Sequence, residues 1–221
     1  MNLSATHALS VSPTTGETLS SLPWASEQQV DAAIALAEQG YRQWRNVSVA
    51  ERAATLRNVG SAMRARGEAL AQMISREMGK PIAQARGEVA KSANLCDWYA
   101  EHGPAMLNTE ATLVEDNKAV IEYRPMGAIL AVMPWNFPVW QVLRGAVPIL
   151  LAGNSYLLKH APNVLGSAAM IGEIFAAAGV PDGVFGWVNA TNDGVSQMIN
   201  DPRIAAVTVT GLSLIHISEP T

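Results

Sequence analysis

The alternation of short apolar runs with helical patterns over residues 119–211 is the feature that most constrains this fold. Aliphatic and aromatic residues dominate five runs, at 119–123, 128–132, 155–158, 184–188 and 205–209. Helical patterns separate the later runs, at 139–151, 164–178 and 195–200. This order predicts βαβ units, and hence an α/β, Rossmann-like parallel sheet with flanking helices. Such sheets bind ligands at the carboxyl ends of their strands, so function is expected just after residues 132, 158 and 209.

The preceding part, residues 1–118, is predicted to be a mainly helical layer that follows an N-terminal β-hairpin. The hairpin turns at 13–16. Ser26 and Ser48 each precede a Gln or Glu by three residues, which is the spacing of a capping box at a helix start. Four helical stretches are expected, at 26–40, 48–63, 68–78 and 82–101.

The composition excludes several classes of function. Fifteen basic and 19 acidic residues give a net charge of −4, which is not typical of a nucleic-acid-binding protein. The single cysteine and four scattered histidines predict neither a disulfide framework nor a metal site. The longest uncharged stretch, 125–143, contains Pro134 and Pro138, which favours a buried strand–loop–helix over a membrane span. The N-terminus lacks a basic region followed by an apolar run, so a cytoplasmic location is expected.

A short loop bounded by Pro134 and Pro138 follows the run at 128–132. Because proline fixes φ, Asn136 is expected to lie in a rigid segment. Its amide could stabilise a developing oxyanion, since a preorganised donor needs little rearrangement during reaction. Spacing alone favours the other interpretation, that Asn136 caps the helix that begins near Pro138.

Lys159 and Gly211 follow two other predicted strands. Lys159 could reach a ribose hydroxyl or a phosphate, or it could be a solvated charge. Gly211 could let the backbone approach a pyrophosphate, or it could be an ordinary turn. His160 is expected to be a surface or second-layer residue. Cys96, beside Asp97 in a helical pattern, is expected to be a buried and unreactive thiol.

The segment Pro134-Trp135-Asn136-Phe137-Pro138, then Lys159, then Val207-Thr208-Val209-Thr210-Gly211 closely resembles the aldehyde dehydrogenase superfamily in order and spacing. The resemblance covers residues 8–211. It implies NAD(P)-dependent oxidation of an aldehyde to an acid, with attack by a cysteine thiolate, hydride transfer to nicotinamide and glutamate-assisted hydrolysis of the thioester. It also implies that the intact enzyme is a homo-oligomer.

The resemblance assigns roles to individual residues. Asn136 corresponds to the asparagine that stabilises the oxyanion, and Lys159 to the lysine that contacts the adenosine ribose. Residues 1–211 would form the NAD(P)-binding domain, with 119–211 as its βαβ core. The implied cofactor-binding residues are Pro134, Trp135, Asn136, Lys159, His160, Ala161, Pro162 and Gly211.

The sequence departs from the family pattern in several places. Pro162 stands where a glutamate usually binds the ribose 2′-hydroxyl, so both NAD and NADP remain open. Leu212 replaces the serine after Gly211, and residues 212–221 resemble a translated sequencing adapter and are expected to be non-native. The family's cysteine and glutamate would lie beyond the last residue. We therefore expect an inactive enzyme fragment, or alternatively a non-catalytic nucleotide-binding or interaction module.

Arg144 interrupts the apolar run 139–151. Burial of an unpaired guanidinium is unfavourable, so it is expected to form a structural ion pair or to bind a substrate carboxylate. Its position resembles that of the arginine that binds the substrate carboxylate in succinate-semialdehyde dehydrogenases. This resemblance indicates oxidation of succinate semialdehyde to succinate.

Overall fold

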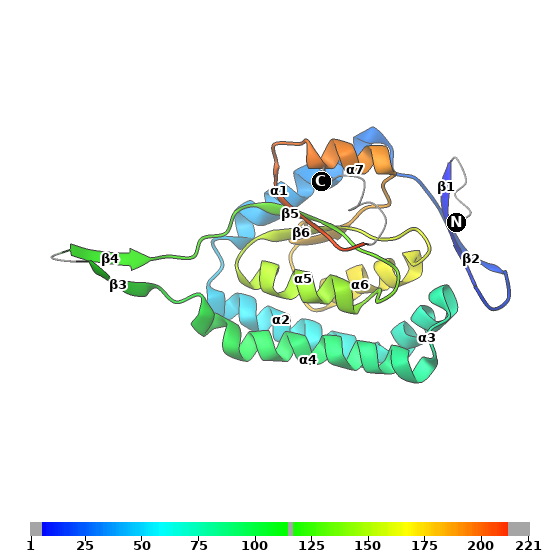
Figure 1. Cartoon of the computed structure of the whole chain (residues 1–221), viewed down its shortest axis with the longest axis horizontal. Coiled ribbons are helices and arrows are strands. Elements are labelled where there is room, and N and C mark those ends of the chain that lie inside the picture. The colour runs from blue at the N-terminus through cyan, green and yellow to red at the C-terminus, as the bar shows by residue number, and fades with distance from the viewer. Residues whose placement is uncertain (1–5, 115–116, 212–221) are drawn as a thin grey trace, which may run out of the picture.

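A four-stranded parallel sheet forms the centre of the computed structural model, which describes residues 6–114 and 117–211 (Figure 1). The strand order is β7-β6-β5-β8. The strands are β5 Ala128–Val132, β6 Ser155–Lys159, β7 Phe185–Trp187 and β8 Ile204–Val209. The chain runs outward from β5 to β7 and then returns to the other side of β5 as β8. The predicted parallel sheet is therefore confirmed, and its strand order reverses beside β5.

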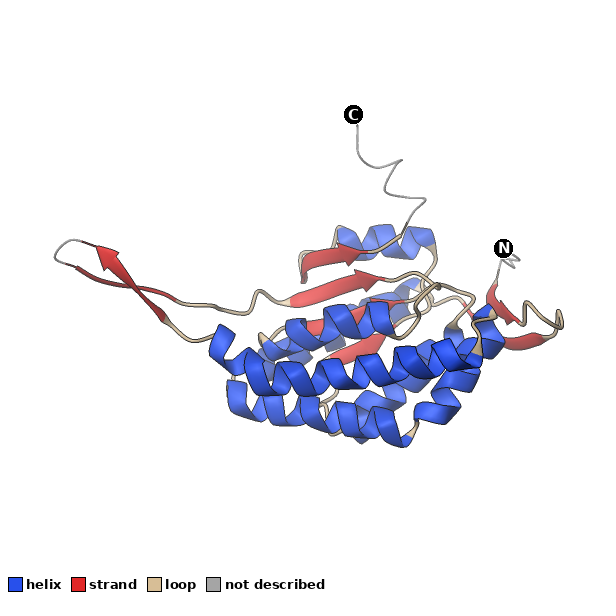
Figure 2. Ribbon diagram, turned by 60° about the horizontal axis from the view of Figure 1, so that its bottom comes forward, coloured by secondary structure: helices blue, strands red, loops and turns tan. Residues whose placement is uncertain are grey.

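Helices cover both faces of the sheet in layers (Figure 2). On one face, α1 Glu27–Trp44 and α7 Asn192–Ile199 pack on the side chains of Leu130 and Leu157. On the other face, α5 Trp140–Leu151 and α6 Leu165–Ala177 pack on Ala131 and Leu158. An outer layer covers α5 and α6, and consists of α2 Val49–Ala65, α3 Gly67–Met78 and α4 Ile82–Met106. The alternation of faces along each strand explains why these strands are almost entirely apolar.

The predicted helix signals are largely confirmed. Ser26 and Ser48 both form complete capping boxes. Gly79 ends α3 with a φ of +74°, a conformation that favours glycine. Helix α1 continues beyond the predicted end at Gly40, because that glycine serves close packing: a Cβ there would lie 2.2 Å from the Gly183 carbonyl carbon.

The predicted strand at 119–123 was assigned to the wrong sheet. It corresponds to β4 Asn117–Ile121, which pairs antiparallel with β3 Glu110–Val114. This two-stranded ribbon extends away from the body of the molecule (Figure 1). Val120 and Ile121 are consequently exposed rather than buried in the central core. The other hairpin, β1 His7–Val11 with β2 Thr18–Pro23, lies where it was predicted.

Other predictions concern absences or the chain end. Within 6–114 and 117–211, no helix is long and apolar enough to cross a membrane, and no three His, Cys, Asp or Glu side chains are grouped to hold a metal ion. The expected non-native tail, 212–221, lies outside the described residues.

Candidate functional site

The carboxyl ends of β5, β6 and β8 lie side by side where the strand order reverses. The pairing register places Val132 opposite both Lys159 and Val209. Two backbone hydrogen bonds extend this edge, from Met133 N to Lys159 O at 3.1 Å and from Thr210 N to Val132 O at 3.0 Å. The three predicted motifs therefore meet at one edge of the sheet, which is the position that open α/β sheets use for ligands.

The loop after β5 presents three consecutive side chains to solvent: Trp135, Asn136 and Phe137. Among the residues that the structure describes, none makes a hydrogen bond to the side-chain amide of Asn136. An exposed amide on a short loop between two prolines is available to a ligand that binds at this edge.

The interpretation of Asn136 as a helix cap is wrong. The N-cap residue of α5 is Val139, and its side chain makes no cap hydrogen bond. The backbone N–H groups of Val139 and Trp140 instead donate to Glu88 Oε1, both at 2.9 Å. Glu88 lies on α4, so a buried carboxylate from the outer layer performs the capping.

His160 supports the same loop from the sheet side. Ala161 N donates to His160 Nδ1 at 2.9 Å, which leaves the proton on Nε2 to donate to Pro138 O at 2.8 Å. Burial lowers the pKa of this imidazole to about 4, so the ring is neutral near pH 7. The second-layer interpretation is supported, and the occupied ring leaves only the backbone of this residue for cofactor contact.

Lys159 differs from its neighbour His160 in having no hydrogen-bond or ion-pair partner within the described part of the chain. Burial lowers the pKa of its ammonium group. Such a cation would gain a partner from a bound hydroxyl or phosphate oxygen. Ala161 and Pro162, which follow on the same edge, are half-buried and carry no charge.

Helix N-termini commonly bind phosphate, but those of α5 and α6, the helices after β5 and β6, are already occupied. Glu88 accepts from the first amides of α5. Glu77 accepts from Gly166 N at 2.6 Å and Ser167 N at 2.9 Å at the start of α6. Gly211, after β8, is exposed, and a Cβ there would meet no atom within 4 Å. Among the described residues, no side chain therefore covers Gly211 at the carboxyl end of β8.

A cavity of about 270 Å³ adjoins this loop between α4 and α5. Lys91 lines it, with its Nζ 3.8 Å from the centre of the Trp140 ring. Gln141 Oε1 is buried there without a hydrogen-bond partner among the described residues. The cavity is lined by Gln84, Gly87, Glu88, Lys91, Phe137, Trp140 and Gln141.

Arg144 is exposed and shares a helix face with Trp140 and Gln141, because residues three and four apart on a helix are neighbours. Within residues 6–114 and 117–211, no carboxylate pairs with it. The structural ion pair is therefore not found, and the guanidinium remains available to a ligand.

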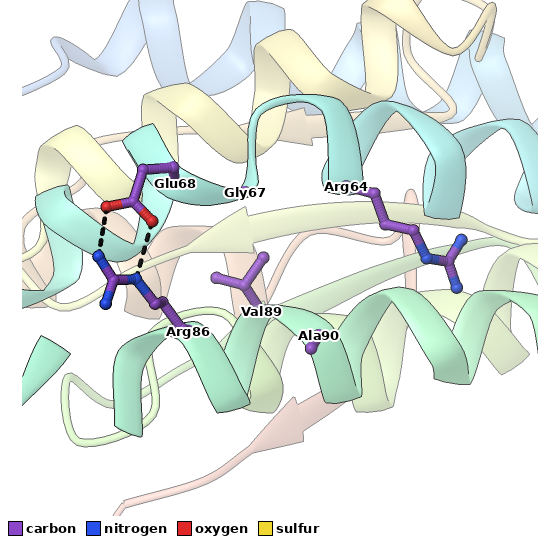
Figure 3. Close-up of a pocket in the computed structure, with 6 residues that line it drawn as sticks. All are labelled: Arg64, Gly67, Glu68, Arg86, Val89 and Ala90. Carbon is purple, nitrogen blue, oxygen red and sulfur yellow. Dashed lines mark hydrogen bonds and ion pairs between the residues drawn. The ribbon is translucent and has the colours of Figure 1, made fainter. Parts of the chain in front are cut away.

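A smaller hollow of about 180 Å³ opens elsewhere, between α2, α3 and α4 (Figure 3). Its two arginines are already paired: Arg86 donates to both oxygens of Glu68 at 2.8 Å, and Arg64 pairs with Asp97. Its charged groups therefore already have partners, and it is not a second candidate site.

The sequence profile described as "Aldehyde dehydrogenase family" matches residues 3–215. The chain belongs to the aldehyde dehydrogenase family. It is 68% identical over 207 residues to the Escherichia coli (strain K12) succinate semialdehyde dehydrogenase [NAD(P)+] Sad. It is 41% identical over 204 residues to a Mycobacterium tuberculosis succinate-semialdehyde dehydrogenase [NADP(+)] 1.

The same family appears among solved structures. A succinic semialdehyde dehydrogenase from Streptococcus pyogenes in complex with NADP+ superposes with a TM-score of 0.90 at 30% identity, over 97% of this chain and 47% of that one. The E. coli match covers 94% of this chain and 45% of the relative, and the M. tuberculosis match covers 91% and 45%. The chain thus spans less than half the length of these relatives.

The family resemblance implies a cysteine nucleophile, and the only cysteine in this sequence is Cys96. Cys96 is fully buried in α4, and burial raises the pKa of its thiol to about 12. It is therefore not a reactive thiolate, as predicted from its position.

The prediction missed the roles of Lys80 and Glu88. Lys80 directly follows Gly79, and no local pattern distinguished it from other lysines of the sequence. A glutamate among small residues on a helix face was the available signal for Glu88, because such a position faces the core and a buried carboxylate needs partners.

Proposed function

We propose that this chain is the cofactor-binding part of an NAD(P)-dependent aldehyde dehydrogenase that oxidises succinate semialdehyde to succinate. The observation that carries the proposal is the free side-chain amide of Asn136, on a braced loop beside the unpaired Lys159. A donor held in this way can bind the oxyanion that forms when a nucleophile attacks an aldehyde.

The residues of the sheet edge divide the binding tasks. Lys159 would hold the ribose or a phosphate oxygen of the dinucleotide, while Pro134 and Trp135 would line its path. The nicotinamide supplies the hydride acceptor when the cofactor is bound. Uncharged Pro162 offers no carboxylate to repel a 2′-phosphate, which supports use of both NAD and NADP.

Two cations support a substrate with a distal carboxylate: Lys91, which lines the α4–α5 cavity, and Arg144, which lies one helical turn after Trp140 of that cavity. Arg144 and Lys91 are both cations without a carboxylate partner in the described part of the chain. A guanidinium binds a carboxylate with two parallel hydrogen bonds, so Arg144 is the assigned substrate residue. The E. coli and M. tuberculosis relatives are both named for succinate semialdehyde.

The chain by itself would bind nucleotide without oxidising aldehyde, because Cys96 cannot act as the nucleophile. The complete enzyme would be a cytoplasmic homo-oligomer. If the chain instead functions alone, the unreactive Cys96 thiol favours a non-catalytic nucleotide-binding module.

The first test is calorimetric titration of the 221-residue chain with NAD+ and NADP+. We expect both to bind, and Lys159→Met to weaken both. The second test joins residues 1–211 to the C-terminal remainder of the E. coli relative and measures NADH or NADPH formation. Activity in this chimera supports the dehydrogenase, whereas nucleotide binding with no activity supports the non-catalytic module.

Substrate class is tested in the same chimera with Arg144→Leu. We expect a higher KM for succinate semialdehyde and an unchanged KM for butanal, which has the same chain length and no carboxylate. An unchanged KM for succinate semialdehyde would refute the role of Arg144.

A further inference from the structure

Lys80 and Glu88 form an ion pair beneath the loop that carries Asn136. Lys80 precedes α4, and Glu88 lies within it. Their side chains are only 7% and 2% exposed. The desolvation of two buried charges offsets much of their attraction, so the pair is not explained by stability alone.

The other contacts of Lys80 are made to the loop. Its Nζ donates to the backbone carbonyl oxygen of Asn136 at 2.9 Å and lies 3.9 Å from the centre of the Phe137 ring. The carbonyl and the side chain of Asn136 share one Cα. Fixing the carbonyl therefore restricts the directions in which the side-chain amide can point.

The remaining contacts of Glu88 lie just beyond the same loop. While Oε2 pairs with Lys80, Oε1 accepts from Val139 N and Trp140 N. Pro138, between Asn136 and these amides, has a fixed φ. The ion pair therefore holds the backbone on both sides of Pro138.

We propose that Lys80 and Glu88 are positioning residues that set the direction of the Asn136 amide. They touch no reacting atom, and their effect on the reaction passes through the loop backbone. This role rests on the proposed function, in which that amide binds the oxyanion. Because the oxyanion forms only during reaction, loss of alignment lowers kcat more than it changes aldehyde binding.

Glu77 provides a matched control within the same chain. It is also a buried glutamate that accepts from the first amides of an inner helix, Gly166 N and Ser167 N of α6. None of its partners belongs to the Asn136 loop, because its remaining hydrogen bonds come from Ser167 Oγ of α6 and Ser10 Oγ of β1. A purely structural effect of a lost helix cap will therefore appear in Glu77→Gln as well.

The first experiment needs no activity. The ¹⁵N-labelled 221-residue chain is compared with Lys80→Met, Lys80→Arg, Glu88→Gln and Glu77→Gln by the side-chain amide signals of Asn136 and by hydrogen exchange at Val139 and Trp140. We expect Lys80→Met and Glu88→Gln to shift the Asn136 signals and Lys80→Arg to keep them nearer their original positions. Unchanged Asn136 signals in folded Lys80→Met would overturn the proposal.

The second experiment measures kinetics in the chimera with the E. coli C-terminal part. We expect Lys80→Met and Glu88→Gln to lower kcat by about 10- to 100-fold, with the aldehyde KM changed by less than about twofold. We expect Glu77→Gln to lower Tm without lowering kcat. An equal loss of kcat in Glu77→Gln would assign the effect to helix capping and overturn the positioning role.

The two proposals fail in different ways. If the unsubstituted chimera is inactive with every aldehyde, the proposed function fails while the amide signals still decide the positioning role. If Lys80→Met does not fold, the decision rests on Lys80→Arg and Glu88→Gln, which retain a hydrogen-bonding group at each position.

Discussion

The N-termini of α5 and α6 are both capped by a buried glutamate, but only the glutamate at α5 is paired with a cation. Neither helix has a side-chain cap of its own, and each receives a buried glutamate from the outer layer. Glu77, which lies on α3 and caps α6, accepts hydrogen bonds from N–H and O–H donors alone, and burial raises the pKa of its carboxyl group. Glu88, at α5, has Lys80 beside it. Glu77 caps α6 without a cation, so capping alone does not explain why Lys80 pairs with Glu88. The hydrogen bond from Lys80 to the Asn136 carbonyl oxygen offers an explanation.

Truncation of the two glutamates is the strongest way to break this comparison. Glu88→Ala leaves a buried ammonium without a counter-ion, and we expect it to lower the free energy of unfolding by about 4 kcal/mol. Glu77→Ala leaves only neutral donors unpaired, for which we expect about 2 kcal/mol. Urea denaturation of both variants measures the difference, and equal losses would show that the ion pair has no special role in stability.

His160 sharpens the comparison, because it supports the same loop without a charge. Its folded pKa of about 4 lies below the ordinary 6.5, so the unfolded chain takes up the proton first. The contribution of neutral His160 to the free energy of unfolding is therefore fully present above pH 6.5. It is lost as the pH falls toward 4, which lowers the free energy of unfolding by roughly 3 kcal/mol.

Denaturation midpoints between pH 4 and 6.5 measure this effect. We expect His160→Gln to flatten that part of the profile. A wild-type profile that matches His160→Gln would contradict the prediction.

The far end of α5 extends the comparison. Arg52 is buried without a carboxylate partner among the described residues, and its Nε donates to Leu151 O at 2.8 Å. Trp44 Nε1 donates to Leu150 O, also at 2.8 Å. Helix α5 is thus held at both ends by side chains of the outer layer and α1. We expect Arg52→Met to lower the free energy of unfolding by about 2 kcal/mol, and Arg52→Lys to lower it by less than Arg52→Met does.

The exposed helix starts should show the smallest effects. The Ser26 and Ser48 hydroxyls accept from Gln29 N and Glu51 N at the solvent-facing starts of α1 and α2. We expect either serine-to-alanine substitution to lower the unfolding free energy by about 1 kcal/mol. A loss as large as that of Glu88→Ala would contradict the distinction between exposed caps and buried ones.

Local signals predicted most of the fold. The capping boxes at Ser26 and Ser48 and the glycine stop at Gly79 depend on a few adjacent residues, so they can be recognised in the sequence. The strand at 128–132 was predicted with the bounds found in β5, because a continuous apolar run between turn residues is typical of a buried parallel strand.

Long-range contacts could not be predicted in this way. The contact from Glu88 to Val139 spans 51 residues, and that from Lys80 to Asn136 spans 56. The partner of the strand at 117–121 was missed for a related reason: an alternating apolar run does not specify whether it joins a sheet or a separate ribbon. The sequence therefore located Asn136 but not the side chains that hold it.

The contact between Gly40 and Gly183 links two segments that are distant in sequence. A methyl group on Gly40 would lie 2.2 Å from the Gly183 carbonyl carbon, and one on Gly183 would lie 2.1 Å from Leu36 O. Each glycine thus makes room for the main chain of the other segment. A side chain at either position would require the whole of α1 to move, so we expect both positions to remain glycine.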